Sequence, residues 1–152
     1  MSQLVTLGGI PLHPLVVHAV VVLVPLTALG AVLMAVMPKF SRRFGPLVAL
    51  GALVSIGSAV LAKEAGEQLA RVKPVTADHL RWGDQAPLWV GLFGLVVIVF
   101  WFFDRGIPAN RPRPLWLRIL AIVVVLLSLV ATVFVLGAGH SGAEAVWAAL
   151  IK

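Results

Sequence analysis

Histidine is the residue type in this chain best suited to chemistry, and it stands at four positions: His13, His18, His79 and His140. The imidazole ring is the commonest metal ligand in proteins, and it also ligates haem iron. Two of the histidines lie at the start of the first apolar segment, one just before the third and one just after the fourth. In a bundle whose helices alternate in direction, all four places fall at the same end. The sequence therefore predicts a histidine site at one membrane face, without indicating a substrate.

Four apolar segments must position these histidines. Of the 152 residues, 61% are hydrophobic and only 12% are charged, whereas a soluble domain has about 25% charged residues. A bilayer-spanning helix needs about 20 apolar residues. The candidate spans are residues 15–37, 46–62 with an extension towards residue 71, 87–103 and 115–136. We therefore expect one all-α transmembrane domain over residues 1–152, an integral membrane four-helix up-down bundle in the lipid bilayer.

Charge predicts which side of the membrane each end faces. One side holds one acid, Asp104, and seven basic residues, namely Lys39, Arg42, Arg43, Arg105, Arg111, Arg113 and Arg118. On the other side, five basic residues balance five acids. Because Lys and Arg accumulate in short cytoplasmic loops, we expect an inner (plasma) membrane protein with both termini and the histidines on the outer face. The net charge of +6 is then explained by topology and by anionic lipid, not by nucleic acid.

Haem b is one ligand that the histidines could hold. Haem in a bundle needs imidazoles on facing helices and an apolar slot for the porphyrin. We expect His18 as the first ligand, because it lies inside the hydrocarbon edge, with His140 or His79 as its partner. Aromatic residues near the same end could line the slot, namely Trp82, Trp89, Phe93 and Trp147.

A transition metal such as zinc or copper is the other candidate, and it needs three or four ligands. The donors available at this end are His13, His18, His79, His140, Glu64 and Glu144. The chain has no cysteine, which excludes thiolate sites and covalent haem attachment. Histidines at a membrane interface also cap helices and bond to carbonyls, so a purely structural role stays open for each of them.

Two motifs resemble those of a family of small bacterial membrane proteins, the domain-of-unknown-function family 2231. They are HPLVVH at residues 13–18 and GHSGAEAVW at residues 139–147. The resemblance covers nearly the whole chain and implies a four-helical protein linked to respiratory redox chemistry, because some members look as if they are fused to c-type cytochrome domains. Ala19 and Val20 stand where members commonly have Phe-Pro, and Ala143 stands where many have glycine.

Two functions of different classes follow from these observations. In the first, the histidines bind haem b or a metal, and the protein serves electron transfer with a cytochrome or respiratory complex. In the second, the chain is a non-catalytic accessory subunit that packs against a larger membrane complex. An enzyme is less favoured, because the sequence contains no HExxH motif and no serine–histidine–acid arrangement. Association of several copies into a homo-oligomer is compatible with both functions.

Overall fold

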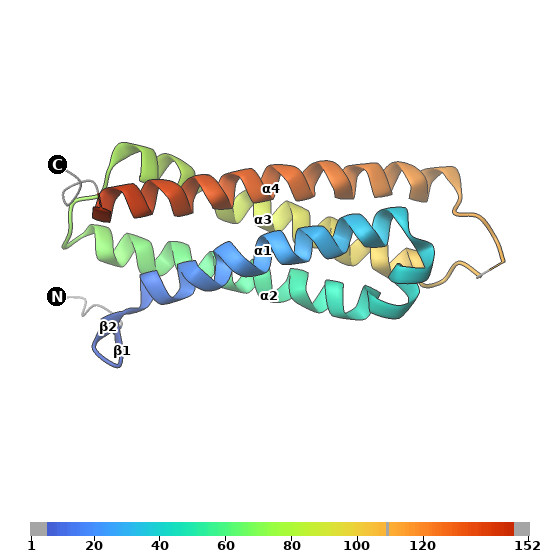
Figure 1. Cartoon of the computed structure of the whole chain (residues 1–152), viewed down its shortest axis with the longest axis horizontal. Coiled ribbons are helices and arrows are strands. Elements are labelled where there is room, and N and C mark those ends of the chain that lie inside the picture. The colour runs from blue at the N-terminus through green and yellow to red at the C-terminus, as the bar shows by residue number, and fades with distance from the viewer. Residues whose placement is uncertain (1–5, 109, 148–152) are drawn as a thin grey trace.

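The computed structural model describes residues 6–108 and 110–147 and shows a bundle of four long helices (Figure 1). The helices are α1 (Leu12–Val36), α2 (Pro38–Ala70), α3 (Ala77–Asp104) and α4 (Leu115–Trp147). Each is long and apolar enough to cross a membrane. The expected all-α four-helix membrane bundle is therefore confirmed. The chain ends, residues 1–5 and 148–152, lie outside the described residues. The position of both termini on the outer face therefore stays a prediction.

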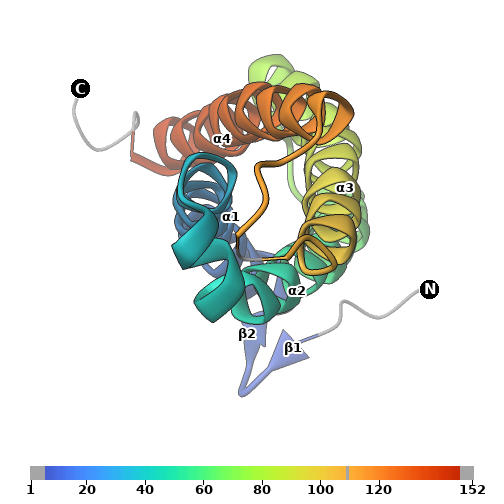
Figure 2. The ribbon, with the colours of Figure 1, turned by 90° about the vertical axis from the view of Figure 1, so that its right-hand side faces the viewer.

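The helices pack in chain order and form a closed ring. Each helix contacts its neighbours in sequence, and α4 also packs against α1 (Figure 2). Short connections force neighbouring helices to run antiparallel, which is why the start of α1 and the end of α4 lie at the same end (Figure 1). We call this the histidine end, and we call the opposite end, where α1 meets α2 and α3 meets α4, the basic end.

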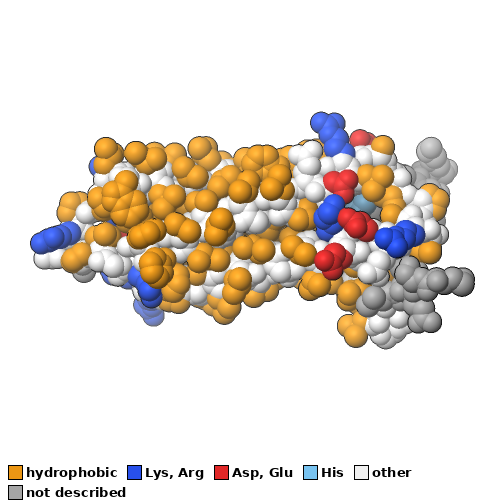
Figure 3. All heavy atoms as spheres, turned by 180° about the vertical axis from the view of Figure 1, so that it is seen from behind, with side chains coloured by type: hydrophobic (Ala, Val, Ile, Leu, Met, Phe, Trp, Pro, Cys, Tyr) orange, Lys and Arg blue, Asp and Glu red, His pale blue; other side chains and the backbone are white. Residues whose placement is uncertain are grey.

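Small side chains let the helices approach closely. The core contains many buried alanines together with a few large side chains, among them Phe93, Phe100 and Met34, which are fully buried. In a bilayer, where lipid is as apolar as leucine, close packing of small residues holds helices together. The large aliphatic side chains face outward, and in Figure 3 they cover the middle of the bundle while the charged residues gather near its two ends.

The helices are longer than the apolar runs that mark them. The second helix begins at Pro38, directly after the single linking residue Met37, so Lys39 and Arg42 lie on its first turns and not in a loop. Proline fits the first helical turn because its missing N–H has no partner there. Similarly, α4 continues past residue 136 to Trp147. The ends of α2 and α4 therefore carry charged residues that lie beyond the apolar runs.

A small hairpin that the sequence analysis did not predict precedes α1. Strands β1 (Thr6–Leu7) and β2 (Ile10–Pro11) pair antiparallel. Gly8 and Gly9 form the turn with φ values of 59° and 81°, a conformation that glycine adopts without steric cost. The hairpin leads directly into α1, whose second residue is His13.

Candidate functional site

His13 and His79 form a close pair at the histidine end. His13 lies in the first turn of α1, and His79 lies in the first turn of α3. Their ring centroids are 6.0 Å apart, and the ring planes are inclined at 79°. His79 was expected just before the third span, but it lies inside α3, which begins at Ala77. Thr76 caps the first turn of α3, and its hydroxyl accepts the His79 backbone N–H at 3.4 Å.

A carbonyl of a neighbouring helix fixes each ring of the pair. The Nδ1 atom of His13 donates to the Ala62 carbonyl oxygen of α2 at 2.8 Å. The Nδ1 atom of His79 donates to the Ala138 carbonyl oxygen of α4 at 3.1 Å, and it lies 3.2 Å from the Ser141 hydroxyl. Because a carbonyl oxygen can only accept, the proton of each neutral ring lies on Nδ1. The lone pair is then on Nε2, the arrangement that metal-binding histidines usually have.

Glycine on the facing helix makes room for each imidazole. A Cβ atom added to Gly66 would lie 2.8 Å from His13 Cε1, and one added to Gly142 would lie 3.1 Å from His79 Cε1. Real side chains essentially never show the first distance, so alanine at residue 66 would displace the His13 ring. Gly66 of α2 and Gly142 of α4 therefore let the rings of His13 and His79 approach these two helices closely.

The other two histidines lie away from the pair. His18 is exposed, and its Nδ1 donates to the Pro14 carbonyl oxygen at 2.5 Å. His140 has 77% of its side chain exposed, with Nε2 3.3 Å from Glu144 Oε1. A helix turns about 100° per residue. His18, five residues after His13, therefore faces about 140° away from it, and His140 lies on nearly the opposite face of α4 from Gly142.

The four histidines therefore do not converge on one centre as the sequence predicted. Within the described ranges 6–108 and 110–147, no three or more His, Asp or Glu side chains are placed to hold a metal ion. Glu64 is exposed on α2, and Glu144 contacts His140 instead of the pair. The structure brings the expected ligands together as two separate pairs, His13 with His79 and His140 with Glu144.

Aromatic residues fill the space beside the pair. Trp82 lies against Gly137 of α4, where an added Cβ would be 2.7 Å from the indole. Both Trp82 and Trp89 contact the Phe134 ring, with centroids 5.3 and 5.5 Å away. Phe93 is part of the core, and Trp147 is 57% exposed. Trp82 and Trp89 thus pack between α3 and α4, close to the histidine end.

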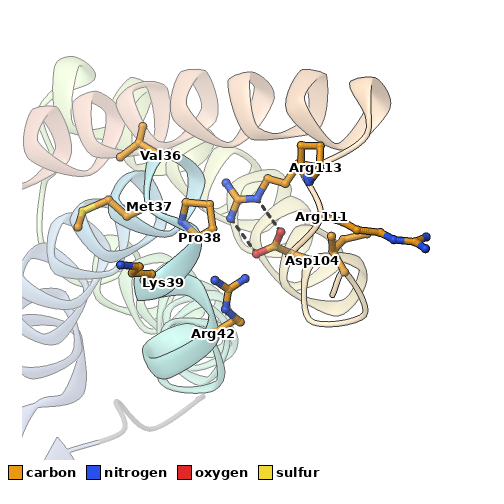
Figure 4. Close-up of a pocket in the computed structure, with 10 residues that line it drawn as sticks. Val36, Met37, Pro38, Lys39, Arg42, Asp104, Arg111 and Arg113 are labelled. Atoms are coloured by element: carbon orange, nitrogen blue, oxygen red, sulfur yellow. Dashed lines mark hydrogen bonds and ion pairs between the residues drawn. The ribbon is translucent and has the colours of Figure 1, made fainter. Parts of the chain in front are cut away.

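A buried ion pair, which the sequence did not predict, lies at the basic end. Asp104 ends α3, and its carboxylate accepts two bonds from Arg113, at 2.7 Å from Nε and 2.8 Å from one terminal nitrogen. The side chains are only 5% and 10% exposed. Arg113 also donates to the carbonyls of Met34 and Ala35, and Ser41 donates to Asp104 at 2.5 Å. Figure 4 shows Asp104 and Arg113 facing each other. The sequence feature that could have predicted this ion pair is that Asp104 is the only acid on the basic side.

Comparison with known proteins identifies the family. No curated protein and no solved structure matches the chain significantly. A family model described as "Predicted membrane protein (DUF2231)" matches residues 9–152. This match spans β2, all four helices and both histidines of the pair. The chain therefore belongs to the DUF2231 family of predicted membrane proteins.

Proposed function

We propose that the protein binds haem b or a transition metal through His13 and His79 on the outer face of the membrane and takes part in respiratory electron transfer. The observation that carries the proposal is the pair itself. Two imidazoles from different helices lie with centroids 6.0 Å apart. Each donates its Nδ1 proton to a backbone carbonyl, so that Nε2 of both neutral rings is left as a lone-pair donor for a metal.

The number of donors favours haem over a structural zinc site. A haem in a bundle would be held by two histidines from different helices, and His13 and His79 would be those two residues. Zinc takes at least three protein ligands, more than the described residues bring together. When bound, haem would supply a one-electron redox couple. The protein would fix the two imidazoles through the Ala62 and Ala138 carbonyls and pack apolar Trp82 and Trp89 alongside.

The distribution of charge supports the outer-face location. Lys39, Arg42, Arg111, Arg113 and Arg118 all lie at the basic end, around the junctions of α1 with α2 and of α3 with α4. The positive-inside tendency of short connections assigns that end to the cytoplasm. The histidine end is then outside, where a cytochrome domain or respiratory complex can reach it.

An accessory subunit without a cofactor is the second candidate. The hydrogen bonds of the two histidines are compatible with this structural role, because the His13 bond connects α1 to α2 and the His79 bond connects α3 to α4. In that case the histidines are structural, and the protein acts by packing against a larger membrane complex or another copy of itself.

The haem and metal content of the protein, purified from its own membranes, distinguishes these two functions. The proposal predicts a Soret band, or about one equivalent of copper or another transition metal by elemental analysis. Replacement of either histidine of the pair should remove it while the protein still inserts and purifies. A colourless wild type without stoichiometric metal would support the accessory role and overturn the cofactor proposal.

A further inference from the structure

Two adjoining cavities open at the basic end, far from the histidine pair. The first has a volume of about 480 Å³ and lies between the start of α2 and the segment after α3; its charged lining residues are Lys39, Arg42, Asp104, Arg111 and Arg113 (Figure 4). The second, of about 610 Å³, lies between α1 and α4. They share Val36, Pro38, Pro112 and Arg113 as lining residues.

The lining of these cavities carries uncompensated positive charge. Asp104 is their only acid, and Arg113 neutralises it. The remaining basic residues, Lys39, Arg42, Arg111 and Arg118, are exposed and form no ion pair with a described residue. In Figure 4, Arg42 points towards the Asp104–Arg113 pair, whereas Arg111 reaches outward from the rim. An anion in the cavity would therefore face several cations.

The second cavity continues the charged region onto an apolar surface. Beyond Arg113 and Arg118, its lining is aliphatic, with Val36 of α1 opposite Ile122 and Leu126 of α4. Arg118, Ile122 and Leu126 are spaced by four residues, so they share one face of α4. Ile122 is 61% exposed and Leu126 is 56% exposed, towards the surrounding lipid. A positively charged region thus continues directly into a membrane-facing hydrocarbon groove.

We propose that this double cavity is a binding site for one anionic diacyl phospholipid. Its phosphate lies where the two cavities meet beside Arg113, with Arg42 in the lining of the first cavity and Arg118 in that of the second, and one acyl chain follows the groove between α1 and α4. A soluble phosphate compound would use the charges but not the groove, whereas a zwitterionic lipid would use the groove but lose much of the charge attraction. Basic cavities between transmembrane helices are known to bind anionic headgroups. This inference does not depend on the histidine pair.

Lipid titration with charge-matched variants tests the site. The purified full-length protein in detergent is titrated with phosphatidylglycerol or with phosphatidylcholine of the same chains, and bound lipid is counted by native mass spectrometry. We expect one tightly held phosphatidylglycerol. The double variant Arg42→Gln with Arg118→Gln should bind phosphatidylglycerol about 25-fold more weakly. Each basic residue beside an anionic lipid contributes about fivefold to the affinity, and the two factors multiply.

The control removes two neighbouring charges that do not line either cavity. Arg43 packs on Phe44 with 5.3 Å from its guanidinium carbon to the ring centroid, and Arg105 packs on Trp101 at 5.2 Å. Arg43→Gln with Arg105→Gln makes the same change in net charge. It should alter the affinity for phosphatidylglycerol less than about twofold, because salt screens exposed charges that lie outside the cavities. Equal losses in both double variants, equal binding of phosphatidylcholine, or displacement by millimolar glycerol phosphate would overturn the proposal.

Discussion

Removal of the Asp104 carboxylate should be among the most destabilising single changes at the basic end. In the Asp104→Ala variant, Arg113 keeps its charge in a site where its side chain is 10% exposed. Ser41 also loses its acceptor. Breaking a buried pair by removing one partner typically costs about 3–5 kcal/mol. The equilibrium constant for unfolding should therefore rise on the order of 100- to 1,000-fold or more.

The assay is reversible unfolding in mixed micelles with increasing SDS, followed by circular dichroism. Asp84→Ala is the matched control, because Asp84 is 63% exposed and pairs with Lys63 at 2.8 Å. An exposed pair contributes about 0–1 kcal/mol. Asp104→Leu with Arg113→Met should cost much less than the two single changes together, since no charge is left buried alone. If Asp104→Ala lowers stability no more than Asp84→Ala does, the argument for a buried, stabilising connection is refuted.

Two further predictions concern orientation and packing. Alkaline phosphatase fused after Lys152 should be active and a fusion after Arg113 inactive, because the enzyme works only outside the cytoplasm; the reverse pattern would place the histidine pair inside. On α3, Gly94→Ala should destabilise the bundle by about 1–3 kcal/mol, because its Cβ would lie 2.7 Å from Ile56 Cδ1 and 3.2 Å from the Ala52 carbonyl oxygen. Gly91→Ala meets nothing within 4 Å and should be neutral or stabilise by up to about 1 kcal/mol; equal effects of the two changes in the same SDS assay would contradict the packing.

Hydropathy was sufficient to predict the four helices, because a bilayer requires long apolar segments whose backbone groups are paired internally. It could not predict the helix ends. Charged side chains such as Lys39 and Arg42 stay helical because their long stems can reach towards the headgroups, so α2 extends beyond the apolar run. The Gly8–Gly9 hairpin was missed because its strands have only two residues each.

The site was harder to predict than the fold, because a common end does not imply a common face. The rotation of a helix separates His18 from His13, and the same rotation turns His140 away from the face of α4 that carries Gly142. Spacing within each helix could have given these angles, but not which faces meet. The contacts of His13 with α2 and of His79 with α4 depend on how all four helices pack. The Asp104–Arg113 pair depends likewise on the path of the connection between α3 and α4.

The most direct test of the histidine site compares the four single histidine-to-alanine variants. Each is purified from the same membranes beside the wild type, and haem and metal per protein are measured by absorption and elemental analysis. His13→Ala and His79→Ala should lose the bound group, whereas the exposed His18→Ala and His140→Ala should retain it and serve as controls at the same end. Loss in His18→Ala alone, equal loss in all four, or a wild type containing neither haem nor metal would contradict the assignment to the His13–His79 pair.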